Sequence, residues 1–385
     1  MAKSSVSFKN VILILVISLP ILALIGAAAF WFALDRPYGD AGNPEMEFVV
    51  ANGDTVRDVA GRLEESGLIK NREYFRLRYS VIDRIAGKLP SKTVDKLGLN
   101  TTLQAGRFSL PHGRRPSDIL HGLTSSSGIR RIYTELTIPE GLTSSGIARR
   151  VEEAGLARAD DVENAIRDIA LEYPIKRNPQ GLQGYLFPDT YNFEKPLDES
   201  FSDSETIAGT IVRAMANKFF DVLDEVDPTW KGLTPSQLHE KITLASIVER
   251  EYRVTEEAPM IAAVFNNRII EGMPLQSCAT VVYTIEETAP GRPFQDEYLR
   301  FNRRIFERYL EIDSSYNTYV NGGLPPGPIS NPGRVAVESV FFPAESDALF
   351  FVVKDPAAGT HTFSRNYDDH LNARESYLNQ FVVKD

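Results

Sequence analysis

The longest uncharged run of the chain lies near its N-terminus and extends from Val11 to Leu34. As an α-helix these residues would span about 36 Å, which suffices for the roughly 30 Å hydrocarbon core of a bilayer. Lys3 and Lys9 precede the run, and acidic residues are among the charges that follow it. The positive-inside rule therefore predicts a cytoplasmic tail over residues 1–10, a single-pass transmembrane helix over residues 11–34 in the cytoplasmic (inner) membrane, and an extracytoplasmic remainder. A signal peptide cleaved after the alanines at 27–29 is the alternative, but the apolar run continues beyond them and favours a retained anchor.

Behind a linker at residues 35–45, the hydrophobic pattern predicts the same strand, turn and helix twice. The second copy lies 88 residues downstream of the first, and residues 147–153 align without a gap on residues 59–65. A duplicated βα unit of this kind is more often a binding or spacing module than a catalyst. We therefore expect one small domain over residues 46–130, and a second βα unit over residues 131–175 that begins a larger domain over residues 131–385.

An apolar helical run near residue 245 contains a carboxylate where its pattern calls for a hydrophobic residue. Spacings of four, three, four and three residues join one stripe, typical of a single buried helix face: Leu238, Ile242, Ala245, Glu249 and Tyr252. A carboxyl group in an apolar wall keeps its proton to higher pH than a free Glu, as a general acid must. Glu249 is therefore the candidate acid. Glu251 is rotated by roughly 200° from it and is expected to face the other way.

The stretch from Gly184 to Phe193 has a period of two and predicts a strand with one aromatic side. Tyr185, Asp189 and Tyr191 lie on that side. Aromatic rings beside an acid can line a sugar subsite, and they can equally belong to a core strand whose hydroxyls reach the surface. The pattern alone leaves both interpretations open.

Composition narrows the classes of function. The chain has 385 residues, 43% of them hydrophobic, and a net charge of −10, so a nucleic-acid partner is not expected. The single Cys278 excludes an intrachain disulfide and a multi-cysteine metal site. No histidine pair has ligand spacing, so we expect neither a metal nor a cofactor.

Several separated motifs occur in an order that resembles the membrane-anchored endolytic murein transglycosylases, the MltG or YceG-like family. The resemblance covers the chain from the expected anchor to His370 and includes a LysM-like unit. Its motifs are Leu103-Gln-Ala-Gly106, Ile138-Pro-Glu-Gly141, Gly184-Tyr-Leu-Phe-Pro-Asp-Thr-Tyr191, Ala245-Ser-Ile-Val-Glu249, Asn267-Arg268, Leu275-Gln276, Tyr316-Asn-Thr-Tyr319, Gly323-Leu-Pro-Pro-Gly-Pro-Ile329 and His361-Thr-Phe363. It implies an α+β fold in which LysM-like βα units precede a mixed α+β catalytic domain.

The resemblance also implies an activity, the cleavage of β-1,4 bonds between N-acetylmuramic acid and N-acetylglucosamine in nascent peptidoglycan strands. Glu249 would act first as acid and then as base, and the C6 hydroxyl of the muramic acid would close a 1,6-anhydro ring. One carboxylate would then suffice, whereas hydrolytic glycosidases typically use two. The implied substrate-binding residues are Tyr185, Asp189, Tyr191, Gln276, Asn317 and Tyr319. Peptidoglycan synthases are implied as partners.

Two positions depart from the family pattern, because Gln183 and Cys278 stand where acidic residues are common. Two other functions compete with the lytic one. A hydrolytic muramidase would use Asp189 or Glu251 as a second carboxylate, and a non-catalytic scaffold would only bind the cell wall.

Overall fold

The computed structural model describes residues 18, 21–22, 25–26, 29–97, 99–125, 130–194, 196, 203–288, 294–300, 305 and 307–382. Its chain divides into two compact units, residues 1–133 with 194–197 and residues 134–193 with 198–385. The expected tail over residues 1–10 and most of the expected membrane span lie outside the described residues. Within the described part, no helix is both long and apolar enough to cross a bilayer.

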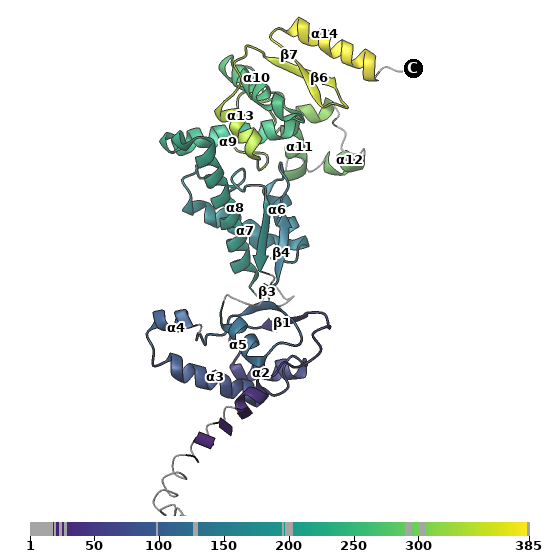
Figure 1. The fold of residues 1–385 in the computed structure, drawn as a ribbon. Coiled ribbons are helices and arrows are strands. Elements are labelled where there is room, and N and C mark those ends of the chain that lie inside the picture. The colour runs from purple at the N-terminus through teal and green to yellow at the C-terminus, as the bar shows by residue number, and fades with distance from the viewer. Residues whose placement is uncertain are drawn as a thin grey trace, which may run out of the picture. The chain divides into compact units, whose positions relative to one another are not determined.

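Unit 1 combines helices with one small sheet (Figure 1). Its elements are β1 (Met46–Val50), α2 (Val56–Glu65), α3 (Arg72–Ala86), α4 (Ser91–Leu97), β2 (Gly106–Leu110), α5 (Pro116–Thr124) and β3 (Arg130–Arg131). The strands pair antiparallel in the order β1-β2-β3, with Phe48 opposite Phe108. These two rings join Leu63, Phe75 and Ile119 in a buried core, where each side chain contributes about 1.5–3 kcal/mol by leaving water.

Unit 2 is larger and mostly helical, with two separate two-stranded sheets. Its helices are α6 (Ser144–Glu153), α7 (Ala159–Ile169), α8 (Ser204–Val226), α9 (Pro235–Glu251), α10 (Ala258–Ile270), α11 (Cys278–Glu287), α12 (Gln295–Arg300), α13 (Arg334–Phe341) and α14 (Tyr367–Tyr377). Its strands are β4 (Tyr133–Thr137), β5 (Thr190–Glu194), β6 (Phe350–Asp355) and β7 (Thr360–Ser364), paired β4-β5 and β6-β7. Short 3₁₀ turns cover 170–172, 228–232, 255–257 and 307–311, and a π turn covers 378–382. The α+β expectation is confirmed.

The predicted duplication is also present in the backbone. Helices α2 and α6 have ten residues each and begin 88 residues apart in the sequence. A threonine N-cap precedes each helix and accepts a backbone N–H of its first turn. Gly67 and Gly155, which follow the two helices, both have φ of +69°, the left-handed conformation that ends a helix.

Helix α9 is buried on every side over residues 242–248, not along one stripe. Besides the predicted stripe, Thr243, Leu244 and Ile247 are each at most 3% exposed. Helix α10 packs back on α9. The Gly/Pro-rich loop at 321–333 is tied to α9, because the Ile329 N–H donates to Ser246 Oγ at 2.9 Å.

The expected strand from Gly184 to Phe193 is wrong over its first half. Only β5, from Thr190, is a strand, and residues 184–189 form a loop that is buried up to residue 188. The backbone N–H groups of Gly184 and Leu186 donate to Asn331 Oδ1 at 2.9 and 3.1 Å instead of to a neighbouring strand. Gly184 has φ of +90°, and a Cβ there would collide with Pro328, so the loop conformation depends on glycine.

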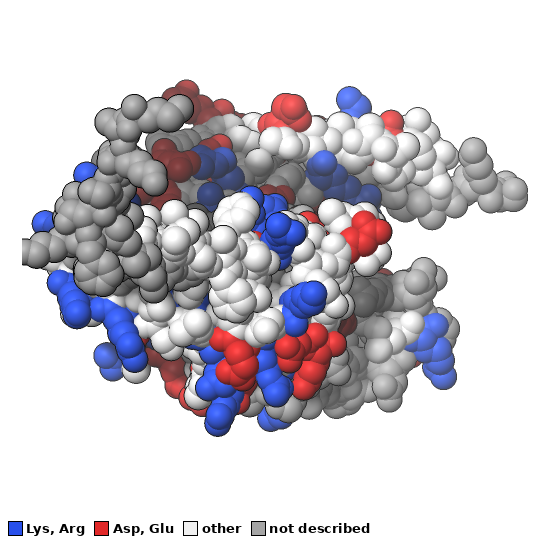
Figure 2. All heavy atoms as spheres, turned by 60° about the horizontal axis from the view of Figure 1, so that its bottom comes forward, with Lys and Arg blue, Asp and Glu red and all other residues white. Residues whose placement is uncertain are grey.

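Basic and acidic residues are interspersed on the face of the molecule shown in Figure 2. Two arginines of unit 1 form ion pairs, Arg107 with Glu47 and Arg131 with Glu194. The charge on these arginines is thus matched locally, which fits a solvated face better than a phosphate-binding stripe.

Candidate active site

A cavity of about 620 Å³ in unit 2 brings together residues that are far apart in the sequence. It is lined by the end of α9, by α10, by the segment that leads into α11, by the turn at Tyr319, and by β6 and α14. Figure 1 shows helix α14 lying along the β6-β7 hairpin, and α14 contacts both strands of the hairpin. Two of the predicted substrate-binding residues, Gln276 and Tyr319, line this cavity.

Glu251, at the C-terminal end of α9, is the only carboxylate among the residues described as lining this cavity. Burial raises the pKa of its carboxyl group, and hydrogen bonds from the Ser277 hydroxyl and the Ala279 backbone N–H oppose that shift. A carboxyl group that keeps its proton in a cavity can serve as a general acid. The helical pattern correctly predicts that Glu251 and Glu249 face different surroundings, but Gln276 and Tyr319 lie with Glu251.

Gln276 has a backbone φ of +54°, in the left-handed region that non-glycine residues rarely adopt. Its N–H donates to the Thr318 carbonyl at 3.1 Å, and its side-chain oxygen accepts from Arg268 at 2.8 Å. Residues held in this conformation cost roughly 1–3 kcal/mol and are often found at functional sites. The strained backbone therefore supports a functional role for Gln276.

Cys278 begins α11 and extends toward Tyr319, with 3.2 Å between its Sγ and the tyrosine hydroxyl. Burial raises the pKa of this thiol. An acidic residue here would place a second carboxylate beside Glu251, so the cysteine leaves the cavity less negative than the family pattern implies.

Asn317 lies beneath the cavity wall and is fully buried. Its amide donates to the carbonyls of Leu310 and Ile312 at 3.0 and 2.9 Å, and its oxygen accepts from the Tyr319 N–H at 3.0 Å. These contacts fix the turn that carries Tyr319. Asn317 therefore positions a cavity residue and does not reach the cavity itself.

The aromatic stretch before β5 lies away from this cavity. Tyr185 has no exposed surface, and its hydroxyl lies 3.4 Å from His239 Nδ1, so it belongs to the core and cannot stack on a sugar in this structure. Tyr191 is partly buried and donates to the Phe187 carbonyl at 2.7 Å. Asp189 is exposed and accepts from the Thr190 N–H. The core-strand interpretation left open by the sequence fits Tyr185 best.

Glu249 is not among the residues that line the larger cavity. Its Oε2 accepts from the Gly333 N–H at 3.0 Å and from the Tyr252 hydroxyl at 3.5 Å. Burial raises the pKa of its carboxyl group to about 7, and the negative charge of Glu140 adds to the shift. Glu140 lies so close to Gly333 that a Cβ at this glycine would overlap its carboxylate. Two carboxylates thus meet beside Gly333.

Replacing Glu249 with Gln is expected to flatten the pH dependence of stability. Burial raises the pKa of Glu249 to about 7 in the folded protein, so the stability contributed by its neutral form is present below pH ~4.3 and is lost as the pH rises through 7. The amide cannot lose a proton. Between pH 5 and 8, we expect the unfolding free energy of Glu249→Gln to fall by about 1–3 kcal/mol less than that of the parent. Urea unfolding at both pH values measures this, and identical pH dependence in the two proteins would contradict it.

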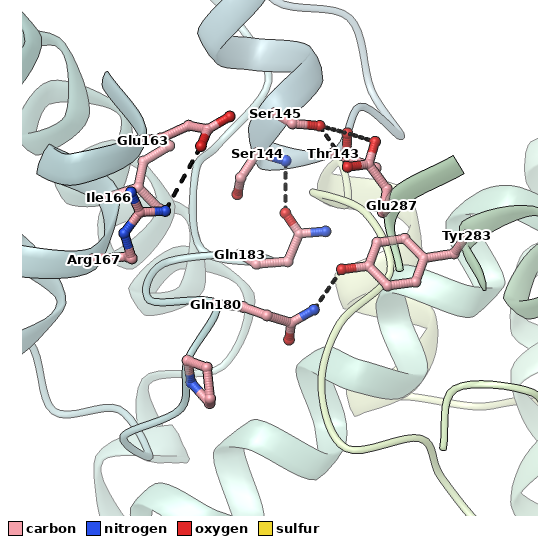
Figure 3. Close-up of a pocket in the computed structure, with 11 residues that line it drawn as sticks. Thr143, Ser144, Ser145, Glu163, Ile166, Arg167, Gln180, Gln183, Tyr283 and Glu287 are labelled. Atoms are coloured by element: carbon pink, nitrogen blue, oxygen red, sulfur yellow. Dashed lines mark hydrogen bonds and ion pairs between the residues drawn. The ribbon is translucent and has the colours of Figure 1, made fainter. Parts of the chain in front are cut away.

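A second cavity, of about 320 Å³, lies at the N-terminus of α6 (Figure 3). Gln183, which is 2% exposed, accepts from the Ser144 N–H at 2.6 Å. Glu287 accepts from the hydroxyls of Thr143 and Ser145 at 3.0 and 2.7 Å. The carbonyl oxygen of Gln183 thus supplies the acceptor that an acidic residue would supply at this helix N-terminus.

Gln183→Leu is expected to destabilise the protein by about 1–3 kcal/mol, because the buried Ser144 N–H loses its acceptor. Gln183→Glu keeps an acceptor at a helix N-terminus, where negative charge is favoured. This variant should therefore lose clearly less stability than Gln183→Leu. Chemical unfolding of the parent and the two variants measures the loss of stability in each variant. Equal losses in both variants would show that the acceptor is unimportant.

The sequence did not single out five polar residues that line the larger cavity, namely Arg268, Ser277, Tyr367, His370 and Arg374. Arg268 belongs to one of the motifs that carry the family resemblance, and this was the only available signal for it. Among the described residues, no group of three or more His, Cys, Asp or Glu could hold a metal ion.

Comparisons with known proteins agree on one family. The model of the YceG-like family matches residues 48–376. An endolytic murein transglycosylase of Bacillus subtilis is 29% identical over 372 residues, covering 93% of this chain and 91% of the relative. One of Streptococcus pneumoniae is 30% identical over 378 residues, covering 91% of this chain and 62% of the relative. A crystal structure of a yceG-like protein from Listeria monocytogenes is 26% identical and covers 85% of this chain and 98% of its own, with a TM-score of 0.49. Since the family model spans most of its length, the chain belongs to the YceG-like family.

Proposed function

We propose that this protein is an endolytic lytic transglycosylase that cleaves the bond between N-acetylmuramic acid and N-acetylglucosamine inside nascent peptidoglycan strands. Two relatives named endolytic murein transglycosylases match nearly the whole chain. The single observation that carries the chemistry is the carboxyl group of Glu249, whose pKa is raised to about 7 by burial.

Glu249 is the proposed acid and base. Its proton moves to the glycosidic oxygen, and the bond from that oxygen to C1 of the muramic acid breaks. The C6 hydroxyl of the same sugar then bonds to C1 and gives its proton to the Glu249 carboxylate. The enzyme returns to its starting state, and no water is consumed. Burial raises the pKa of Glu249 to about 7, so near neutral pH the group can both give a proton and take one back.

Gln276 and Tyr319 are the proposed substrate-orienting residues, since both line the cavity with Glu251. Arg268 fixes the orientation of the Gln276 amide by donating to its oxygen, which leaves the amide N–H₂ to donate to sugar oxygens. Asn317 acts indirectly by holding the turn at Tyr319. Such positioning lowers the barrier because the reacting atoms need not be reoriented.

Glu251 is a second candidate for the acid. The observation that favours it is that it lines the larger cavity together with Gln276 and Tyr319. Its carboxyl group already accepts from the Ser277 hydroxyl and the Ala279 N–H, and it lies outside the Ala245–Glu249 motif that carries the family resemblance. We therefore rank Glu249 first.

The products test the function. The purified protein is incubated with uncrosslinked glycan strands, and the fragments are examined by mass spectrometry. We expect internal cleavage to fragments with 1,6-anhydro ends. Fragments heavier by one water would indicate a hydrolytic muramidase, and the absence of cleavage would favour a wall-binding scaffold.

The remaining proposals concern location and binding. Residues 11–34 are proposed as a single-pass anchor that leaves the N-terminus in the cytoplasm and both units outside it. The βα unit of residues 46–130 and its second copy are proposed as LysM-like glycan-binding modules, and peptidoglycan synthases as partners. Membrane fractionation with and without residues 1–34 tests the anchor.

A further inference from the structure

Helix α3 of unit 1 has an apolar row on its surface that is not part of the core of the unit. The inward face of the helix packs in that core through Phe75 and Ile82. Leu77, Val81 and Ile85 lie on another face, and 52%, 38% and 47% of them is exposed. Their spacing of four residues places them in one row along the helix. A row of large exposed aliphatic side chains is typical of a surface that contacts something apolar.

The same side of α3 binds the helical turns at residues 29–34, which end the proposed anchor (Figure 1). The Trp31 ring meets the Tyr74 ring edge to face, with 5.3 Å between the centroids. Asp35 Oδ2 lies 3.6 Å from Arg78 Nη1. At about 100° per residue, Tyr74 and Arg78 are turned by no more than about 60° from Val81. The exposed row therefore continues the side of α3 that holds the end of the anchor.

The chain that follows the anchor is bound to unit 1 as well. Asp35 Oδ1 accepts from the Ser117 N–H at 3.0 Å, at the start of α5. The Tyr38 carbonyl accepts from the Gly113 N–H, also at 3.0 Å. The sequence predicts a linker from residue 35, but its first residues are held by these hydrogen bonds. Unit 1 is therefore fixed close to the end of the anchor.

The polar residues of this region carry an excess of positive charge. Residues 70–96, which contain α3 and α4, include eight Lys and Arg against three Asp and Glu, although the whole chain has a net charge of −10. Arg84, Lys88 and Lys92 are exposed. An apolar face bordered by Lys and Arg is the pattern of helices that lie in the plane of a membrane interface, where the cations meet lipid phosphates.

We propose that α3 lies on the extracytoplasmic surface of the membrane, with Leu77, Val81 and Ile85 inserted among the lipid headgroups. The proposal rests on the proposed anchor at residues 11–34 and is independent of the proposed chemistry. A bilayer is favoured as the occupant because the anchor, whose end is bound to this side of α3, brings lipid to it. The basic residues then face the phosphates. Since the anchor alone fixes one point, this second contact would also fix the orientation of unit 1 on the membrane.

Depth measurements on the full chain test the contact, in vesicles of phosphatidylcholine and phosphatidylglycerol. In a Cys278→Ser background, a bimane label is attached after Val81→Cys or Ile85→Cys, and its quenching by lipids that carry a nitroxide at a known depth is measured. Ser80→Cys is the matched control, because Ser80 is exposed on the same helix but turned by about 100° from Val81. We expect quenching at positions 81 and 85 to be at least about twofold stronger than at position 80, because an interfacial helix buries its apolar face by about 5–10 Å.

Flotation of the same vesicles separates this proposal from the anchor. A chain that floats with the vesicles but is quenched equally at positions 80 and 81 keeps the anchor and overturns the contact. A chain that does not float overturns both. Efficient disulfide dimerisation of the unlabelled Val81→Cys protein in the vesicles, with weak quenching at position 81, would assign the row to a second copy of the chain and would also overturn the proposal.

Discussion

Glu249→Gln is expected to lower the rate of glycan cleavage at least about 100-fold, because a general acid and base contributes roughly 10²–10⁴-fold. The amide has nearly the same shape as the carboxylic acid and still accepts from the Gly333 N–H and the Tyr252 hydroxyl, so the site should keep its form. The loss should therefore fall on kcat and leave strand binding almost unchanged. Anhydro ends released per minute from uncrosslinked strands, measured at saturating substrate, give the rate.

Glu251→Gln is the comparison variant, because Glu251 is an acid of α9 two positions further on that also has a raised pKa but faces different surroundings. We expect this variant to lose less than about tenfold in rate, since the amide still accepts from the Ser277 hydroxyl and the Ala279 N–H and the acid at residue 249 is unchanged. Circular dichroism and an unfolding curve establish that both variants are folded. The opposite result, a large loss in Glu251→Gln and a small one in Glu249→Gln, would show that the acid is the second candidate.

The helical period alone does not separate Glu249 from Glu251. A stripe at spacings of three and four identifies the inward face of a helix only when the other faces are exposed. Residues 242–248 of α9 are buried on every face, so Thr243, Ser246 and Ile247 lie inside as well as the stripe residues among them. Burial raises the pKa of both acids at the end of this stretch, so the choice between them depends on what surrounds each carboxyl group.

Local features of the fold were predictable because they depend on neighbouring residues. The two βα copies could be read from their N-cap threonines, apolar spacing and terminal glycines. The cavity could not be read in this way. It joins Glu251, Gln276, Tyr319 and His370, which meet only through tertiary packing. The positive φ of Gln276 likewise has no sequence signal, because it is imposed by the contacts of Thr318 and Arg268.

Asn331→Ala is expected to destabilise unit 2 by roughly 2–6 kcal/mol, because it removes the only described acceptor of two buried backbone groups. The side-chain oxygen accepts from the N–H groups of Gly184 and Leu186 at 2.9 and 3.1 Å, and the amide donates to the Leu142 carbonyl at 3.0 Å. The residue is 1% exposed, so water cannot readily replace these bonds. Each N–H left without an acceptor costs about 1–3 kcal/mol.

The Asn331 side chain joins three loops that lie far apart in the sequence. Its removal should therefore destabilise more of unit 2 than these loops alone. The Asn331 backbone carbonyl also accepts from the Gly141 N–H at 3.0 Å, and Gly333, two residues on, donates to Glu249. Urea unfolding compares the variant with Asn372→Ala, an exposed asparagine of α14 whose replacement should change stability by less than about 0.5 kcal/mol. If Asn331→Ala cost no more than that control, the loop at 184–189 would have to be held by its packing against Pro328 and α9, and not by the hydrogen bonds of Asn331.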